Sequence, residues 1–271
     1  LEDDVMYGKA LSYSRLAYDL ENLLSPTFAA IALLYFSYTG LFVGNSIAFI
    51  ISAIIIIITF IPLPKPVQRA GSIWNEVSYG IIAYFKTPRL RMLLVLYVAV
   101  ASASAMIIVN TIIYVKEYLG GSDSELAIFF AVSGFGSMLA ALCFPKLSVI
   151  FKDKSIVQSG AIFLAVGLAL MALEPAFSFA LVAWFVTGVG LSLVQTPSGK
   201  IVNESATPSD RSSYFSAQFA LSHLCWLIAY PIVGQLVLYF GFGFSAAFLA
   251  CIIMICFIFA VLFWPSESET S

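Results

Sequence analysis

Several side chains that could do chemistry lie inside long apolar stretches of this 271-residue sequence, where a polar group is costly. The stretch 213–239 contains the only histidine, His223, together with Gln218 and Tyr230. His223 could relay protons, because imidazole gains and loses a proton near physiological pH. The alternative, and the commoner role for such a residue, is a hydrogen bond that joins two helices. His223 is our first candidate for proton coupling, since no other titratable group sits so deep in an apolar stretch.

Near the start of the chain, Arg15 and Asp19 are four residues apart within the apolar stretch 13–36. On a helix this spacing permits an ion pair between the two side chains. Such a pair could line a translocation path or gate its mouth. Alternatively, Arg15 extends to the membrane surface and merely neutralises Asp19.

Two more polar groups occur in later stretches. Asn110 and Thr111 could hydrogen-bond a substrate or tie two helices together. Gln195 lies two residues before Pro197, which interrupts the backbone hydrogen bonds of a helix. That interruption suits a gate, but it is also typical of a plain helix end.

The sequence gives no support for an enzyme, a metal site or a nucleic-acid-binding protein. It contains no nucleophile–base pair, phosphate-binding loop or zinc signature, and no basic patch with interleaved aromatic residues. We therefore expect no catalytic residue, no metal and no cofactor. The four cysteines all fall within apolar stretches and are expected to be small buried hydrophobic residues: Cys143, Cys225, Cys251 and Cys256.

The elements that must position these side chains are apolar segments long enough to cross a bilayer. The composition is 61% hydrophobic and only 10% charged, which excludes an ordinary soluble domain. About 20 apolar residues span the hydrocarbon core as a helix, since a helix pairs its own backbone groups. The sequence therefore predicts an all-α polytopic membrane protein with eight spans: 13–36, 41–62, 92–115, 124–145, 155–173, 177–198, 213–239 and 243–264.

The basic residues predict how these spans are oriented. Twelve of the 13 Lys and Arg residues lie near the start of the chain, at Lys9 and Arg15, or in segments 63–91, 146–154 and 199–212, and Lys116 is the exception. Cytoplasmic loops are enriched in Lys and Arg. We therefore expect these segments, and both ends of this chain, to be cytoplasmic.

Segment 63–91 divides the chain, with two spans before it and six after it. It follows a proline-rich run and then places Trp74, Val77, Ile81 and Phe85 at the spacing of one apolar helical face. This pattern predicts a helix in the inner membrane interface. An ordinary connecting helix packed on protein is the alternative.

The two spans before this linker resemble the last two spans of the chain. Each pair has a proline in its first helix, Pro26 or Pro231, and then a Leu-Tyr-Phe run at 34–36 or 238–240. The offsets are 205 and 204 residues. Parallel repeats of this kind occur in transporters built from two like halves. The repeat predicts a twelve-span protein of which this chain, beginning at Leu1, contains eight spans.

At this point the chain resembles the major facilitator superfamily of secondary transporters, and more closely its bacterial exporters of the drug-efflux and nickel-resistance type. The resemblance covers essentially the whole chain. Residues 1–62 match the last two helices of the first bundle, 63–91 the cytoplasmic linker, and 92–271 the six-helix second bundle. The closer resemblance depends on four runs: Pro88-Arg89-Leu90-Arg91, Val109-Asn110-Thr111, Gln195-Thr196-Pro197-Ser198-Gly199-Lys200, and the run from Ala217 to Trp226.

The resemblance implies a secondary active transporter of the bacterial inner membrane that works by alternating access. Its partners would be the lipid bilayer, a small-molecule substrate (a drug, metabolite or metal ion) and protons as the coupling ion, with export as the direction. The alternative is a non-transporting structural or receptor-like membrane protein.

Overall fold

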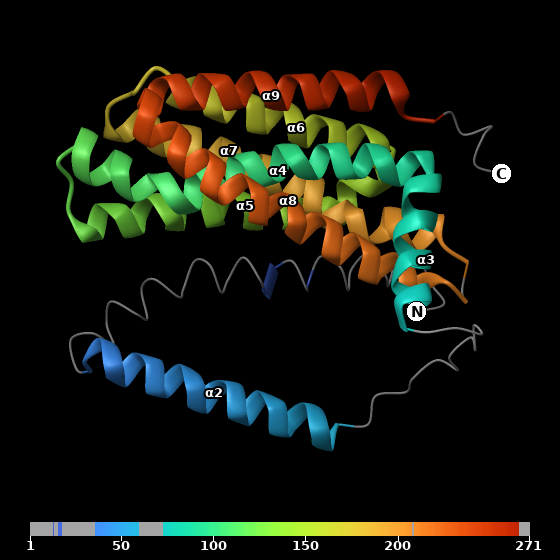
Figure 1. The fold of residues 1–271 in the computed structure, drawn as a ribbon. Helices are drawn as coiled ribbons and strands as arrows, with labels where there is room; N and C mark the ends of the chain where they lie inside the picture. Colours follow the sequence, from blue (N-terminus) through green and yellow to red (C-terminus); the bar gives the residue numbers. More distant parts are fainter. Residues whose placement is uncertain (1–12, 14–15, 18–35, 60–72, 208, 266–271) are drawn as a thin grey trace.

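The computed structural model describes residues 13, 16–17, 36–59, 73–207 and 209–265 (Figure 1). In this part of the chain all regular secondary structure is helical, and seven helices are long and apolar enough to cross a membrane. The prediction of an all-α polytopic membrane protein is confirmed. The first predicted span, 13–36, lies almost wholly outside the described residues, and so do Arg15, Asp19 and Pro26.

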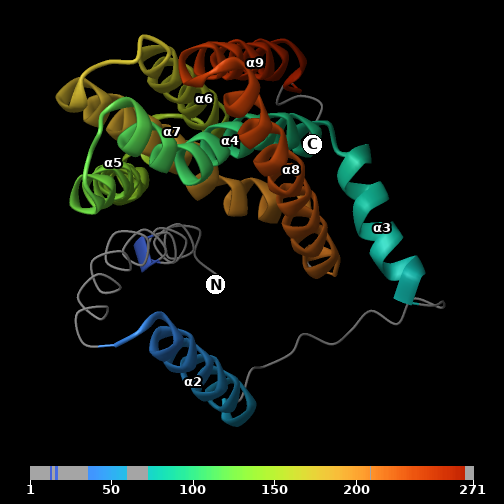
Figure 2. The same ribbon diagram turned by 60° about the vertical axis from the view of Figure 1, so that its left-hand side comes forward.

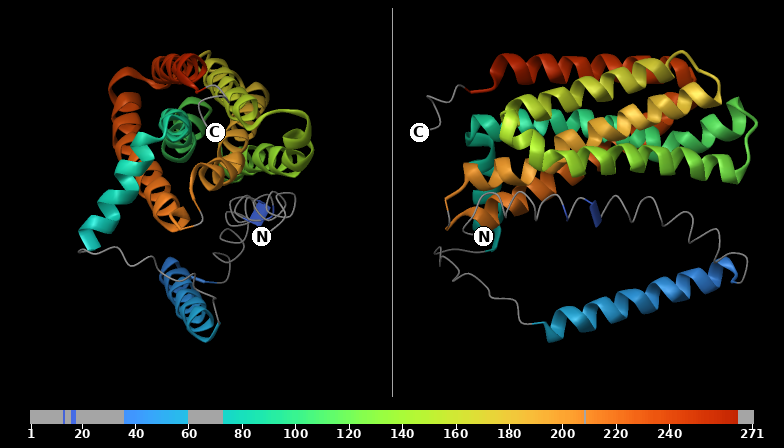
Figure 3. Two further views of the ribbon diagram at one scale, coloured as in Figure 1. Left: turned by 90° about the vertical axis from the view of Figure 1, so that its right-hand side faces the viewer. Right: turned by 180° about the vertical axis from the view of Figure 1, so that it is seen from behind.

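Six of the seven spans form one bundle (Figures 1 and 3). Within it, α7 packs closely against both α5 and α6, whereas α4 contacts α8 and α9. The six helices are α4 (Pro88–Ile113), α5 (Asp123–Ile150), α6 (Asp153–Met171), α7 (Phe177–Ser205), α8 (Arg211–Phe240) and α9 (Phe242–Phe263).

Glycines allow α5 and α7 to approach closely. A Cβ atom on Gly136 would lie 2.3 Å from the carbonyl oxygen of Phe185, and one on Gly188 would lie 2.0 Å from that of Ser133. Both distances are impossible for a real side chain. Lipid supplies no hydrophobic drive for helix association, so close backbone packing of this kind stabilises the pair.

Large apolar side chains lie both in the interior of the bundle and on its outer surface. Trp184, Phe129 and Leu96 are completely buried, whereas Phe219 and Leu227 are largely exposed. An outward-facing apolar surface suits a protein whose solvent is lipid, because lipid tails are as apolar as the protein interior.

The cysteines, like the large apolar side chains, are partly buried and partly exposed. The expectation that all four are buried is wrong. Cys256 is buried and Cys225 is half-buried, but Cys143 and Cys251 are exposed. A small apolar side chain need not be buried in protein when lipid surrounds the helix.

The spans begin and end close to the predicted positions, with two exceptions. α5 continues past Pro145 to Ile150, and α7 continues past Pro197 to Ser205. The interpretation of Pro197 as a plain helix end is therefore wrong. Proline within a membrane helix is tolerated where neighbouring groups compensate for the lost hydrogen bond. As a result, much of the two charged segments predicted as loops is helical.

The linker contains helix α3 (Ile73–Lys86), which contacts α8 and is separated from α4 by Thr87 alone (Figure 2). A Cβ atom on Gly80 would lie 2.6 Å from the carbonyl oxygen of Ser213 on α8. Ile81 packs against the bundle core, and Phe85 is exposed. The side chains of Trp74 and Val77 lie outside the described residues. The structure thus shows a helix packed on protein, with the apolar side chain of Phe85 exposed.

Helix α2 (Tyr38–Ile58) lies apart from the six-helix bundle in the views of Figures 1 and 3. Its apolar side chains, among them Phe49 and Ile57, are exposed in the described part of the chain. The division of the chain at the linker stays a prediction.

Candidate functional site

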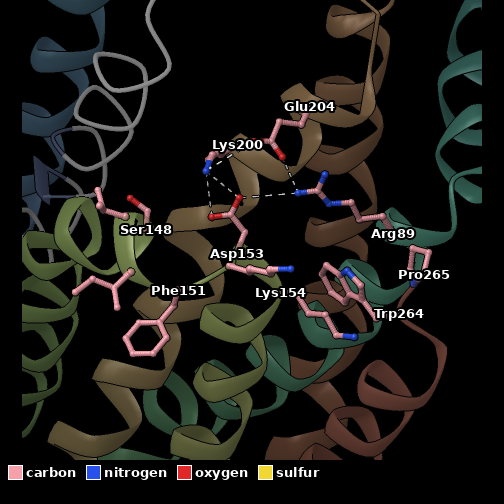
Figure 4. A pocket seen from close by; sticks show the side chains of 12 residues that line it. Arg89, Ser148, Phe151, Asp153, Lys154, Lys200, Glu204, Trp264 and Pro265 are labelled. Carbon is pink, nitrogen blue, oxygen red and sulfur yellow. Dashed lines mark hydrogen bonds and ion pairs between the residues drawn. The ribbon is translucent and has the colours of Figure 1, made fainter. Parts of the chain in front are cut away.

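Four charged side chains from three helices meet at one end of the bundle, and we call this cluster the charged end: Arg89, Asp153, Lys200 and Glu204 (Figure 4). The Lys200 Nζ atom lies 3.1 Å from the Asp153 carboxylate, and the Arg89 guanidinium lies 2.7 Å from the Glu204 carboxylate. The cross pairs are longer, at 3.9 Å for Arg89–Asp153 and 3.7 Å for Lys200–Glu204. Each cation therefore contacts both anions.

The members of the charged end differ in burial. The Asp153 side chain is only 8% exposed, whereas those of Arg89, Lys200 and Glu204 are 20%, 24% and 39% exposed. A buried carboxylate must be paired with a cation, because it has lost its hydration. The four charges balance, and they line a pocket of about 420 Å³.

Helix ends bring these four residues together. Arg89 lies in the first turn of α4, Asp153 is the first residue of α6, and Lys200 and Glu204 lie on α7 beyond Pro197. The cluster was not predicted from the sequence, because residues 199–212 were expected to form a loop. The four-residue spacing of Lys200 and Glu204 is the signal that could have revealed a continuing helix.

Gln218, a predicted site residue, joins α8 to the linker helix. The hydroxyl of Tyr84 on α3 donates a hydrogen bond to the Gln218 side-chain oxygen, and both residues are buried. Burial raises the pKa of Tyr84 well above its usual range, with smaller contributions from Tyr97 and Cys225. The Gln218 Nε2 atom has no hydrogen-bond partner in the described part of the chain. Gln218 thus joins α8 to α3 by a buried hydrogen bond.

At the opposite end of α4 lies a cluster that we call the aromatic end: Tyr114, Tyr118, Trp184 and Phe242. Trp184 donates a hydrogen bond of 2.8 Å to the hydroxyl of Thr111, another predicted site residue. The rings of Tyr114 and Phe242 have centroids 4.4 Å apart. Thr111 therefore ties α4 to α7, which is the second of the two roles considered for this residue.

Asn110, next to Thr111, is completely buried. Its Nδ2 atom lies 3.7 Å from the Met106 sulfur, and its Oδ1 atom has no hydrogen-bond partner among the described residues. A buried amide oxygen without a donor is costly. Asn110 thus retains an acceptor that a substrate group could use.

His223 is exposed on α8, and its ring and hydrogen-bond contacts with described residues come from α8 itself. Its Nδ1 atom lies 2.7 Å from the Phe219 carbonyl oxygen, and its ring packs at 3.9 Å on the Phe219 ring and at 4.9 Å against Trp226. A carbonyl only accepts hydrogen bonds, so Nδ1 carries the hydrogen. In that tautomer Nε2 is the ring nitrogen without a hydrogen.

The remaining candidates do not converge with these groups into one site. Gln195 on α7 and Tyr230 on α8 are both half-buried, and Tyr230 packs against the bundle core. The hydrogen bonds of Thr111, Gln218 and His223 run to different residues at different levels of the bundle. Among the described residues, no three His, Cys, Asp or Glu side chains are grouped so that they could hold a metal ion.

Comparison with known protein families identifies the bundle. The family model of the Major Facilitator Superfamily matches residues 93–271, which is two thirds of the chain and covers nearly all of α4 to α9. None of the curated proteins matches the chain. Polar groups on helices of an apolar bundle, together with this match, indicate a membrane transporter that takes a small-molecule substrate. The chain belongs to the Major Facilitator Superfamily.

Proposed function

We propose that the protein is a secondary active transporter that works by alternating access. The observation that carries this proposal is that the family match, residues 93–271, coincides with the six-helix bundle. In this proposal residues 1–62 belong to a first bundle, 63–91 form the linker and 92–271 form the second bundle. The two bundles hold the substrate between them and rock about it, as in other transporters built from repeats.

We further propose proton-coupled export across the bacterial inner membrane, with both ends of this chain in the cytoplasm. The distribution of Lys and Arg supports the orientation, and the resemblance to drug-efflux and nickel-resistance exporters supports the direction. The exposed imidazole ring of His223 supports a role in proton transfer. Asp19, outside the described residues, is the second candidate.

Proton flux in inside-out vesicles that contain the full-length protein tests the coupling. A pH gradient is imposed, and ethidium or Ni²⁺ is added as a probe of the two exporter types. The wild-type protein is expected to release protons from the vesicles when a probe is transported. We expect His223→Ala and Asp19→Asn each to lower this release at least tenfold.

Gln235→Ala provides the matched control, because Gln235 is another exposed polar residue on α8. It is expected to leave the flux unchanged. Normal proton release in both His223→Ala and Asp19→Asn would overturn the assignment of these residues. Probe uptake that continues without any proton release would overturn proton coupling itself.

A further inference from the structure

The linker helix α3 lies across the direction of the six spans, at the charged end of the bundle (Figures 1 and 3). A single residue, Thr87, separates it from the start of α4. The spans run through the bilayer, so a helix that crosses their direction where a span begins runs along the membrane surface. α3 therefore lies at the level where lipid headgroups meet hydrocarbon.

Two hydrogen bonds hold α3 against α8 at two different depths. The Tyr79 hydroxyl donates to the Asp210 carboxylate, 3.1 Å away, just before α8 begins. The Tyr84 hydroxyl donates to the side-chain oxygen of Gln218. At a rise of 1.5 Å per residue, Gln218 lies about 12 Å further along α8 than Asp210. Because α8 enters the membrane from this end, Tyr79 marks the aqueous side of α3 and Tyr84 the side nearer the middle of the bilayer.

The two flanks of α3 on either side of its contact with α8 differ in character. Phe85 follows Ile81 by four residues and shares its flank, and Ile81 packs against the bundle core. Lys86 follows Tyr79 by seven residues and shares the aqueous flank. Phe85 points about 120° away from Tyr79 around the helix, toward the bilayer. Ile82 lies between the flanks, and Phe85 and Ile82 are 45% and 53% exposed.

The exposed apolar side chains of α3 continue the outer apolar surface of the spans. Phe219, next to Gln218 on α8, is 65% exposed, and it lies at the level where α3 crosses α8. An apolar side chain on the outside of a membrane bundle contacts lipid. Amphipathic helices at a membrane surface bury their apolar face about 5–10 Å into the boundary between headgroups and acyl chains, with lysine on the polar face. Phe85, Ile82 and Lys86 are placed in this way.

We propose that α3 is an interfacial anchor. Phe85 and Ile82 insert between the lipids of the leaflet beside the charged end, while Lys86 stays at the level of headgroups and water. The partner of this surface is the membrane lipid. The two hydrogen bonds to α8 then fix the depth at which α8 enters the membrane. The proposal requires only that the spans cross a bilayer, and the proposed orientation adds that this leaflet is the inner one.

Electron paramagnetic resonance of single spin labels tests the proposal. The four native cysteines of the full-length protein are replaced by alanine, and a label is attached at Phe85→Cys. The protein is reconstituted in vesicles of dioleoylphosphatidylglycerol and dioleoylphosphatidylcholine. Collisions of the label with oxygen, which concentrates in the bilayer, are compared with collisions with a nickel chelate that stays in water. We expect the ratio of oxygen to chelate collisions to be about fivefold higher at Phe85→Cys than at Lys86→Cys.

Lys86→Cys is the matched control, because Lys86 is the neighbouring exposed residue on the aqueous flank. Ile82→Cys should give an intermediate ratio. Equal ratios at Phe85→Cys and Lys86→Cys would overturn the proposal, since both side chains would then lie in water. Few collisions of the Phe85→Cys label with either reagent would also overturn it, since protein would then cover this flank. If Phe85→Cys does not fold, a ratio at Ile82→Cys no higher than at Lys86→Cys overturns the proposal.

Discussion

The two ends of α4 are held in place by different chemistry. At the charged end, partly exposed ion pairs join α4 to α6 and α7 beside an open pocket. At the aromatic end, buried rings and neutral hydrogen bonds join α4 to α7 and α9. Trp184 is completely buried, whereas the Glu204 side chain is 39% exposed. The difference implies that salt acts mainly on the charged end, while changes in packing weaken mainly the aromatic end.

The largest effect is expected from Trp184→Ala at the aromatic end. The substitution removes a completely buried ring and its hydrogen bond to Thr111. Loss of a buried aromatic side chain costs about 3–5 kcal/mol of stability. The measurement is the midpoint of thermal unfolding in a non-ionic detergent, followed by circular dichroism.

We expect the stability loss of Trp184→Ala to be the same in 0.1 M and 1 M salt, because no charge is involved. Trp184→Phe keeps most of the ring volume and should lose clearly less. If salt changed the effect of Trp184→Ala as strongly as it changes substitutions at the charged end, the contrast between the two ends would fail.

The next effect in size is expected from Asp153→Ala at the charged end. Among the residues that the structure describes, this change leaves Arg89 and Lys200 with only Glu204 as a counter-charge. Breaking a buried pair costs about 3–5 kcal/mol, and we expect about 2 kcal/mol here because the partners are partly exposed to solvent.

Two further measurements sharpen this prediction. The double variant Asp153→Ala/Lys200→Ala should recover part of the lost stability, since one uncompensated charge is removed with it. Salt at 1 M shortens the Debye length to about 3 Å and should reduce the difference between wild type and Asp153→Ala. A double variant that loses more stability than the two single variants lose together would contradict the network.

The aromatic end shows what the sequence could predict and what it could not. Hydropathy located every described span, because the bilayer forces its helices to be long and apolar. It also singled out Thr111 as a polar residue in an apolar stretch. It could not predict that Trp184, 73 residues away, would be the hydrogen-bond partner of Thr111, since only the packing of α4 on α7 sets that pairing.

The charged end was missed for a different reason. A helix does not stop where its apolar run stops, and α7 continues for several residues into the polar zone. From the sequence, Lys200 indicated only the orientation of the spans, and Asp153 had no predicted role. His223 was recognised as polar in an apolar stretch, but hydropathy cannot tell that the ring faces outward and packs on Phe219.

Tyr84→Phe tests whether the effect of salt depends on the position of a residue or on the charge of the bond that is removed. Tyr84 precedes α4 by a few residues and so lies near the charged end, but its hydrogen bond to Gln218 is neutral. Loss of one such bond to a buried partner costs about 1 kcal/mol. The same thermal measurement should show a loss that is independent of salt. Tyr79→Phe, which removes a half-buried hydroxyl bonded to Asp210 3.1 Å away, should cost less.

The smallest effect is the response of the Tyr84 hydroxyl to alkaline pH. Burial raises the pKa of Tyr84 in the folded protein above the value of 10.0 expected for the unfolded chain. Above pH 10 the unfolded chain therefore binds fewer protons than the folded one at this residue, so the free energy of unfolding falls as pH rises. At pH 10 this loss is about 0.4 kcal/mol relative to pH 8. Tyr84→Phe has no hydroxyl to ionise, so the difference in stability between wild type and Tyr84→Phe should shrink by that amount between pH 8 and pH 10. The effects of the other tyrosines cancel in this difference. A difference that stayed constant would mean that the Tyr84 hydroxyl is open to solvent, and the contact between α3 and α8 would then be looser than the buried bond to Gln218 requires.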